Sequence, residues 1–306
     1  MNGISVIIPT YNNEKYIAQA VNSVLEQDYA GKIEVIVSDD GSKDNTLEVL
    51  KQFGCKIIII EKPHDCISQG PGPARNRGLS YASQPYICFL DSDDCYLPYH
   101  LSNLSKVLDS NENCGFGFCR MLIFNENSNL GLYRAWTRLK ITKNDIKNPV
   151  ISNNNVVNTG ILFFKKCVFE KVGVFNELYK YGEDGDMWMR ISELYSGIFA
   201  DYYGMIHRKH ENSFSSNHNR GVFKCYFSEV FKDARQRYYD LGMDDKYRIM
   251  KLNLLIWKYK ILYLKPFHVL YGIYKRIQKR KQLNLRNWHS LAYFLKENEF
   301  YSSENS

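Results

Sequence analysis

Two aspartates separated by one residue follow a short apolar run, in the Asp-Ser-Asp-Asp segment at residues 91–94. On an extended backbone alternate side chains point the same way, so Asp91 and Asp93 would face a common point. Divalent cations such as Mg²⁺ and Mn²⁺ take oxygen ligands, often one or two carboxylates together with substrate phosphates. Acidic turns also cap helices, and Pro98 soon begins one. The segment alone leaves a metal site and a helix cap equally open.

Two further loops carry groups suited to a nucleotide. The Asp-Asp-Gly-Ser turn at residues 39–42 offers carboxylates to a base or a ribose, although a tight turn that caps the next helix explains it equally well. Arg75 and Asn76 lie at the start of a predicted helix, where the helix N-terminus and a guanidinium both favour an anion such as phosphate. A solvated basic helix start is the alternative for these two residues.

Two later segments contain further candidate residues, which are two acids, a tryptophan and a histidine. Glu183 and Asp184 open a predicted helix; acids usually complement the helix dipole there, but a carboxylate could also take a proton from an acceptor hydroxyl. Trp188 can stack on a sugar or anchor the helix, and from the residue alone we favour the core. His210 follows a predicted strand and could ligate the metal or contact a diphosphate, whereas a lone loop histidine is usually solvated.

An alternation of strands and helices must position these side chains. The apolar pattern predicts strands at 4–8, 33–37, 56–60, 86–90, 115–124, 160–164 and 198–206, and helices at 74–83, 98–111 and 183–194. Such alternation implies a parallel α/β sheet, whose ligands bind outside the carboxyl ends of the strands. Residues 9–11, 39–40 and 91–94 each follow a strand. We therefore expect these three loops to converge on one edge of the sheet.

Composition indicates a globular intracellular protein. The 306 residues are 44% hydrophobic and 24% charged, which is ordinary for a soluble domain. The eight cysteines form no C-x-x-C pair and no zinc-finger spacing, so we expect reduced thiols in the cytosol. No secretory signal is visible, and no apolar run reaches the length of roughly 18 residues that a spanning helix needs.

The net charge of +7 is concentrated towards the C-terminus. Residues 246–281 contain 11 Lys or Arg and no Asp or Glu, interleaved with aromatic residues. This pattern is compatible with a peripheral contact of residues 245–281 with an anionic membrane surface, on its cytoplasmic face. Packing against the preceding α/β domain or a homodimer face explains it equally well. Loss of liposome binding on deleting residues 245–306 would support the membrane interpretation, and unchanged binding would remove it. We expect no nucleic-acid partner.

Taken in order, the segments resemble the family 2 (GT-A type) inverting glycosyltransferases. The resemblance spans roughly residues 3–214 and is carried by six segments, at 5–12, 37–46, 74–78, 89–94, 183–184 and 208–213. It implies a GT-A fold, a mostly parallel Rossmann-like sheet flanked by helices. The implied catalytic domain covers residues 1–218, with a nucleotide half over 1–95 and an acceptor half over 96–218. A helical, basic C-terminal region over 219–306 carries none of the motifs.

The resemblance also implies the roles of individual residues. A metal-assisted transfer with inversion is expected, in which Asp184 is the general base and the cofactor is Mn²⁺ or Mg²⁺. The resemblance implies that Glu183 and Trp188 contact the acceptor. It implies that the metal is bound by Asp93, Asp91 and His210. The residues implied to contact the nucleotide-sugar are Pro9, Thr10, Tyr11, Asp39, Arg75, Asn76, Asp91 and Ser92. We expect a UDP-linked donor and a hydroxyl of a glycan or lipid-linked acceptor, in surface polysaccharide or cell-envelope glycan synthesis.

Other functions compete with this interpretation. A sugar nucleotidyltransferase needs a similar sheet and metal-binding acids, but usually carries a Gly-rich phosphate loop after its first strand, where this chain has Pro-Thr-Tyr-Asn at 9–12. A Rossmann dehydrogenase is disfavoured by the missing G-x-G-x-x-G. A non-catalytic binding protein of the same fold is a third alternative, and the presence of both Asp93 and Asp184 argues against it.

Overall fold

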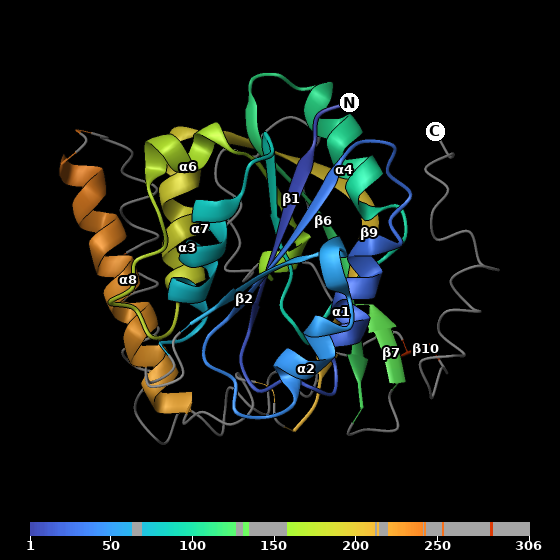
Figure 1. Ribbon diagram of the computed structural model, residues 1–306. Helices are drawn as coiled ribbons and strands as arrows, with labels where there is room; N and C mark the ends of the chain where they lie inside the picture. The colour runs from blue at the N-terminus through green and yellow to red at the C-terminus, as the bar shows by residue number, and fades with distance from the viewer. Residues whose placement is uncertain are drawn as a thin grey trace.

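A mixed β-sheet forms the centre of the computed structural model, with helices on both of its faces (Figure 1). Along the sheet the strands follow the order β10-β7-β6-β8-β4-β1-β2-β3, and β9 pairs with β5 and β6. The structure describes residues 1–62, 69–126, 131–134, 158–211, 213, 220–240, 242, 253 and 282–283.

The N-terminal half of the sheet is parallel. β1 (Ile4–Thr10) lies between β2 (Ile33–Asp39) and β4 (Tyr86–Phe89), and β3 (Ile58–Glu61) pairs with β2. Every residue of β1 is buried, because helices cover both faces of this part of the sheet. The predicted arrangement of the first four strands is therefore confirmed.

Beyond β4 the sheet contains strands of both directions. β8 (Leu162–Lys165) is antiparallel to β4 and to β6 (Cys114–Asn125), whereas β9 (Ser196–Lys209) runs parallel to β6. The remaining described strands are β5 (Cys95–Tyr96), β7 (Gly131–Arg134) and β10 (Gln282–Leu283). An antiparallel neighbour needs no crossover helix, and the apolar pattern does not reveal strand direction. The sheet is thus parallel throughout its N-terminal half and mixed beyond it.

Helices cover the two faces of the sheet as separate layers (Figure 1). One layer contains α3 (Pro71–Tyr81), α6 (Cys167–Val172) and α7 (Glu183–Leu194), with α8 (Arg220–Asp240) against α7; the other contains α1 (Ile17–Leu25), α2 (Thr46–Lys51) and α4 (His100–Asp109). Arg237 of α8 donates to Asp186 (3.1 Å) and to Glu193 (3.2 Å), both on α7. The described start of the C-terminal region is therefore helical and packs against α7.

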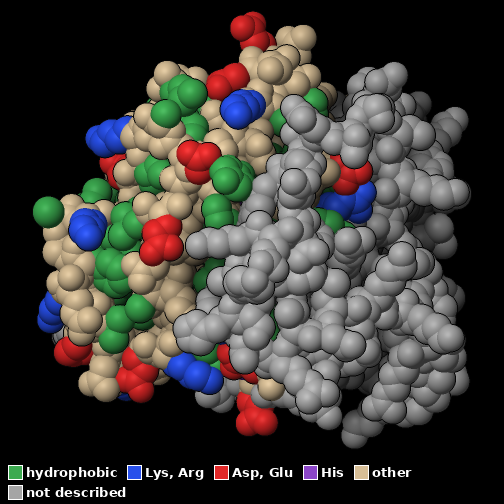
Figure 2. All heavy atoms as spheres, turned by 90° about the vertical axis from the view of Figure 1, so that its right-hand side faces the viewer, with side chains coloured by type: hydrophobic (Ala, Val, Ile, Leu, Met, Phe, Trp, Pro, Cys, Tyr) green, Lys and Arg blue, Asp and Glu red, His purple; other side chains and the backbone are tan. Residues whose placement is uncertain are grey.

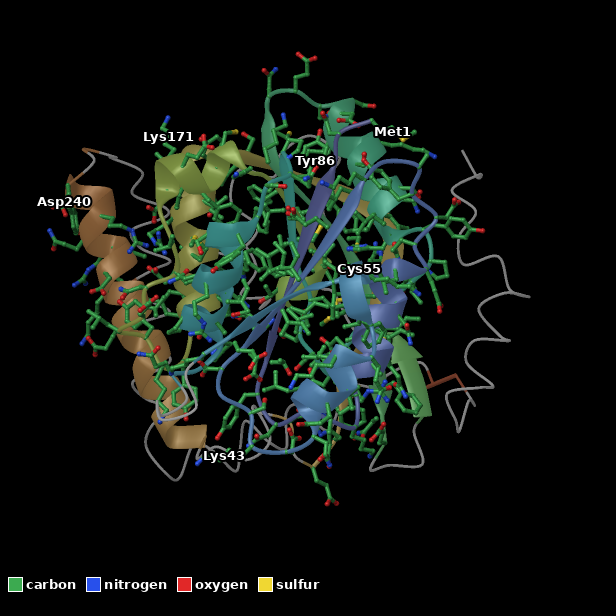
Figure 3. The ribbon with its side chains drawn as sticks, in the orientation of Figure 1. Met1, Lys43, Cys55, Tyr86, Lys171 and Asp240 are labelled. Atoms are coloured by element: carbon green, nitrogen blue, oxygen red, sulfur yellow. The ribbon has the colours of Figure 1, made fainter. Side chains whose placement is uncertain are left out.

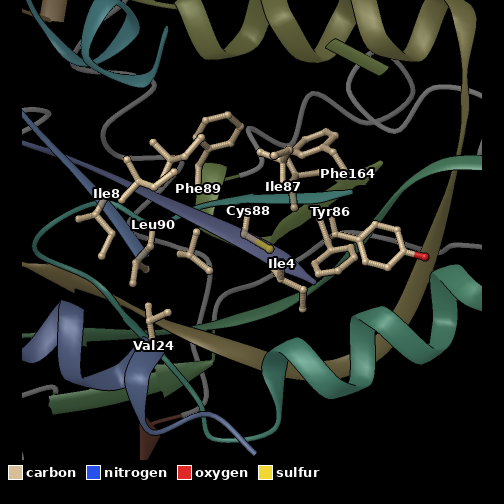
Figure 4. Close-up of a cluster of buried hydrophobic side chains, with 14 of the residues drawn as sticks. Ile4, Ile8, Val24, Tyr86, Ile87, Cys88, Phe89, Leu90 and Phe164 are labelled. Atoms are coloured by element: carbon tan, nitrogen blue, oxygen red, sulfur yellow. The ribbon is translucent and has the colours of Figure 1, made fainter. Parts of the chain in front are cut away.

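The core lies where β1 and β4 meet the helices, and Figure 4 shows part of it. Phe89 is fully buried and meets Phe164, Phe169 and Phe175 edge to face, with ring centroids 6.3, 5.8 and 5.3 Å apart. These aromatic contacts join β4 to β8, to α6 and to the segment before α7. They fix the end of β4, from which the Asp-Ser-Asp-Asp loop emerges.

The described surface gives no sign of a membrane span. Acidic and basic side chains are interspersed on the described part of the face in Figure 2. Among the described residues, no helix combines the length and the apolar character that crossing a bilayer requires. Apart from Asn253, residues 245–281 lie outside the described part of the chain, so membrane contact and a homodimer face stay predictions.

Candidate active site

The predicted ligand loops meet at the carboxyl ends of β1, β2 and β4. Because these strands are parallel neighbours, their ends share one edge of the sheet, the edge near Lys43 in Figure 3. The N–H of Asp40 donates to the carbonyl of Thr10 (2.9 Å), and Nδ2 of Asn13 donates to Oγ of Ser92 (2.7 Å). The three loops therefore converge as the sequence predicts.

Asp93 and His210 face each other within this edge. Nε2 of His210 lies 3.1 Å from Oδ2 of Asp93, and the carboxylate keeps 22% of its exposure. An imidazole nitrogen and a carboxylate oxygen are both suitable ligands for a divalent cation. The described residues contain no group of three or more His, Cys, Asp or Glu that could hold a metal ion. A cation bound by this pair would complete its shell with substrate phosphates and water.

Arg75 is buried between two carboxylates, at 4% exposure. Its Nη2 donates to Oδ1 of Asp91 (2.8 Å) and its Nη1 to Oε1 of Glu183 (2.9 Å). Burial acts to lower the pKa of Arg75, but the two carboxylates outweigh it and raise that pKa above its usual value. The guanidinium joins the 91–94 loop to the start of α7, and the nucleotide contact of Arg75 stays a prediction. Asp91 is paired with Arg75, whereas Asp93 faces His210, so a metal role for Asp91 stays a prediction.

Two more predicted ligand contacts are occupied by the protein. Nδ2 of Asn76 donates to the carbonyl of Phe175 (2.9 Å) and to Glu177 (2.8 Å), while the N–H of Phe175 donates to Oδ1 of Asn76 (2.9 Å). Asn76 therefore holds the segment that precedes α7. Glu183, expected to meet the acceptor, is 5% exposed and bonded to Arg75. The nucleotide contact of Asn76 and the acceptor contact of Glu183 both stay predictions.

Trp188 belongs to the aromatic core. It is 4% exposed, stacks on Phe164 with ring centroids 5.0 Å apart, and meets Phe175 edge to face at 5.7 Å. The core position favoured from the residue alone is therefore confirmed, and the acceptor contact implied by the resemblance stays a prediction. Its position follows from α7 lying on the sheet, which turns this side of the helix inward.

We expect Trp188→Ala to lower the free energy of unfolding by about 3–5 kcal/mol, because it leaves a large cavity in the aromatic core. Urea unfolding followed by circular dichroism measures this loss. The exposed Tyr81, with 58% of its surface accessible, supplies the control, and Tyr81→Ala should change stability by no more than about 0.5 kcal/mol. Equal losses in the two variants would contradict the core position of Trp188.

Glu183 and Asp184 form the first turn of α7, after Gly182 with a φ of 80°. Burial and the neighbouring Asp184 raise the pKa of Glu183 to about 7, against the opposing effect of Arg75. Asp184 is half-buried, accepts a hydrogen bond from the N–H of Gly185 (2.6 Å), and forms no ion pair within the described residues. Burial also raises the pKa of Asp184. Within the described part of the chain, Glu183 is held by a cation and Asp184 is not.

Asp39 organises the turn that follows β2. Its carboxylate is fully buried and accepts from the N–H groups of Gly41 and Ser42, each at 2.9 Å, as well as from the Ser42 hydroxyl. Gly41 has a φ of 86°, a backbone angle that favours glycine. The tight-turn interpretation of this motif is confirmed, and the base contact of Asp39 stays a prediction.

Asp40 has a structural role that the sequence did not suggest. Its Oδ2 accepts from the N–H groups of Gln69 (2.7 Å) and Gly70 (2.9 Å), and its Oδ1 accepts from Nη2 of Arg77 (2.8 Å). Nζ of Lys62 lies 3.6 Å from the same oxygen. Asp40 thereby ties the start of α3 to the end of β2. The only sequence signal was a second acid in the turn, since these four partners are distant in the chain.

The remaining predicted donor contacts differ in accessibility. Pro9, Thr10 and Ser92 are buried, whereas Tyr11 keeps 43% of its surface exposed at the end of β1. Thr10 lies beside the turn of β2 through its carbonyl, and Ser92 accepts from Asn13. All four stay predictions as contacts to a nucleotide.

Asp94 anchors the acidic loop to the end of β9. Its Oδ1 accepts from the N–H of Arg208 (2.8 Å), Nδ1 of His207 lies 3.1 Å from both of its oxygens, and Nδ2 of Asn158 donates to Oδ2 (3.1 Å). Burial acts to lower the pKa of His207, but Asp94 outweighs it and raises that pKa to about 9. Asp94 thus has a structural role, holding the 91–94 loop against the end of β9.

Comparison with known proteins places this site in a family. The sequence profile of glycosyl transferase family 2 matches residues 5–173, which include the ends of β1, β2 and β4 but not Asp184. The chain is 30% identical over 210 residues to an uncharacterized glycosyltransferase of Rickettsia prowazekii, covering 66% of this chain and 62% of that relative. It is 33% identical over 218 residues to the UDP-Glc:alpha-D-GlcNAc-diphosphoundecaprenol beta-1,3-glucosyltransferase WfgD of Escherichia coli, covering 70% of this chain and 80% of that enzyme.

Solved structures share the fold. A structure of Staphylococcus aureus TarS residues 1–349 with UDP-GlcNAc superposes with a TM-score of 0.65 at 22% identity, covering 85% of this chain and 71% of that one. The mannosyltransferase PcManGT of Pyrobaculum calidifontis, in complex with GDP-Man and Mn²⁺, superposes with a TM-score of 0.54 at 16% identity, covering 90% and 79%. The family profile, which spans more than half of the chain, and the E. coli relative decide the assignment. This protein belongs to glycosyl transferase family 2 and has the fold that its sequence predicts.

Proposed function

We propose that this chain transfers a sugar from a UDP-linked donor to a hydroxyl of a glycan or lipid-linked acceptor, with inversion, in cell-envelope glycan synthesis. The E. coli relative is named for a UDP-glucose donor and a diphosphoundecaprenol-linked acceptor, and the TarS structure holds UDP-GlcNAc. These names support the donor and acceptor classes. The fold and the acidic edge of the sheet support a site that could receive them.

One observation carries the proposal. Asp184 is a half-buried carboxylate that forms no ion pair among the described residues. It directly follows Glu183, which Arg75 links to the 91–94 loop. In the proposed reaction, Asp184 takes the proton of the acceptor hydroxyl, and the acceptor oxygen attacks the anomeric carbon. The bond from that carbon to the diphosphate breaks, and UDP leaves with the electron pair. A positioned base of this kind is typically worth about 10²- to 10⁴-fold in rate.

Asp93 and His210 would hold the divalent metal. Their facing ligand atoms, 3.1 Å apart, fit a cation that also binds substrate phosphates. When bound, the cation supplies positive charge beside the diphosphate, where negative charge develops on the leaving group. Residues 1–95 would form the nucleotide half of the catalytic domain and residues 96–218 its acceptor half, with residues 219–306 as the C-terminal region.

The reaction can be tested with radiolabelled UDP-glucose or UDP-GlcNAc, Mn²⁺ and a GlcNAc-diphosphate lipid as acceptor. We expect label to move to the acceptor and UDP to be released, and EDTA to suppress both. A nucleotidyltransferase would instead consume UTP and a sugar 1-phosphate and release pyrophosphate. Binding of the UDP-sugars without any turnover would favour a non-catalytic role and contradict the proposal.

A further inference from the structure

A hydrogen-bonded group of three side chains surrounds the Asp93–His210 pair. Tyr16 precedes α1, Glu126 follows β6, and Arg208 lies near the end of β9. The hydroxyl of Tyr16 donates to Oε2 of Glu126 (2.7 Å), and Nη1 of Arg208 donates to Oε1 of the same carboxylate (2.7 Å). Glu126 thus joins two residues from distant parts of the chain, and we call the three the Tyr16–Glu126–Arg208 frame.

Each end of the frame reaches one member of the pair. Nε of Arg208 donates to the backbone carbonyl of Asp93 (3.0 Å), which fixes the chain that carries this carboxylate. The ring of Tyr16 packs on the ring of His210, with centroids 4.6 Å apart. The guanidinium of Arg208 also lies over the Tyr16 ring, 4.7 Å from its centroid. The frame therefore contacts both proposed ligands, Asp93 through Arg208 and His210 through Tyr16.

Two side chains of the frame, those of Arg208 and Tyr16, are shielded from solvent. Arg208 is 3% exposed and Tyr16 is 6% exposed. Nη2 of Arg208 donates to Gln19 of α1 (2.6 Å), so the guanidinium has a partner for each of its three directions. Glu126 also lies beside Lys15, whose Nζ is 3.4 Å away and whose side chain is 70% exposed, so this contact contributes little.

We propose that Glu126 is a positioning residue for the Asp93–His210 pair, holding Arg208 and Tyr16 so that the two ligand atoms keep their facing geometry. This inference rests on the proposed function, because it assigns the pair to a metal that binds with the donor diphosphate. A carboxylate that accepts two hydrogen bonds from groups touching both ligands restricts their motion before any cation arrives. Removing outer partners of metal ligands typically costs about 10- to 100-fold in metal affinity.

The test compares UDP binding to the full chain with and without Mn²⁺, by isothermal titration calorimetry. For Glu126→Gln we expect binding in Mn²⁺ to weaken about 10-fold or more, while binding in EDTA stays at the wild-type value. Tyr16→Phe keeps the ring against His210 but loses the bond to Glu126, and should weaken Mn²⁺-dependent binding in the same direction by a smaller factor. Glu112→Gln, at an exposed glutamate after α4, is the matched control and should behave as wild type.

The outcomes separate this inference from the proposed function. If wild-type protein binds UDP more tightly with Mn²⁺, but Glu126→Gln and Tyr16→Phe show the same enhancement, Glu126 has no positioning role. If Mn²⁺ does not strengthen UDP binding to wild-type protein, the metal site of the proposed function is contradicted, and so is this inference. Should Glu126→Gln fail to fold, as judged by circular dichroism, Tyr16→Phe decides the question.

Discussion

Replacing Asp184 by asparagine is expected to reduce kcat for sugar transfer by about 10²- to 10⁴-fold, because the amide has the same shape but accepts no proton. Binding of UDP should be unchanged, since Asp184 lies at the start of α7 and not in the 91–94 loop. Initial rates of acceptor glycosylation, together with calorimetric titration of UDP in Mn²⁺, measure the two effects. Wild-type turnover by the variant would remove Asp184 as the base.

The pH dependence provides a second check on the same residue. A general base acts only when deprotonated, so kcat should fall as the pH drops through the pKa of Asp184. Burial raises that pKa, so the acid limb should lie above the range of an ordinary aspartate. The residual activity of Asp184→Asn should lack this limb. Glu170→Gln, at an exposed glutamate of α6, is the matched acid-to-amide control and should keep the wild-type profile.

The main architecture of the fold could be predicted from the sequence, because local patterns determine it. The β-branched run in β1 has no polar face, which is typical of a strand covered on both sides, and the structure buries all of it. The end of each parallel strand then fixes where the following loop must lie, so the meeting of residues 9–11, 39–40 and 91–94 follows from topology alone.

Partner choice within the site could not be predicted in the same way. Arg75 is bonded to Asp91 and to Glu183, which lies 108 positions further along the chain, and no local pattern encodes that pairing. The direction of Trp188 depended on which side of α7 meets the sheet. Several motif residues that the sequence suggests as ligand contacts therefore also hold the ligand-binding loops in place.

Arg75→Met is expected to lower the free energy of unfolding. It would leave the carboxylate of Glu183 buried without its cation, and that of Asp91 unpaired at 32% exposure. Breaking a buried ion pair on one side typically costs about 3–5 kcal/mol, and the partial exposure of Asp91 points to the lower end, about 3 kcal/mol. Urea unfolding of the variant measures the loss. Arg75→Lys should recover only part of it, because one ammonium cannot reproduce the forked contact with two carboxylates.

The same substitution should also change catalysis in a way that a purely structural role would not. Arg75 lowers the pKa of both Glu183 and Asp184, so removing it should move the acid limb of kcat to higher pH. Adding Glu183→Gln to the Arg75→Met variant removes one stranded carboxylate, and the double variant should be more stable than the sum of the two single losses, with a coupling of about 0.5–3 kcal/mol. Additive losses and an unmoved acid limb would mean that Arg75 does not connect the acidic loop to the base. If the acid limb of kcat moves to higher pH and the losses of unfolding free energy are not additive, the buried Arg75 guanidinium has two roles. It sets the charge state of the carboxylates at the start of α7, and it holds the 91–94 loop against that helix.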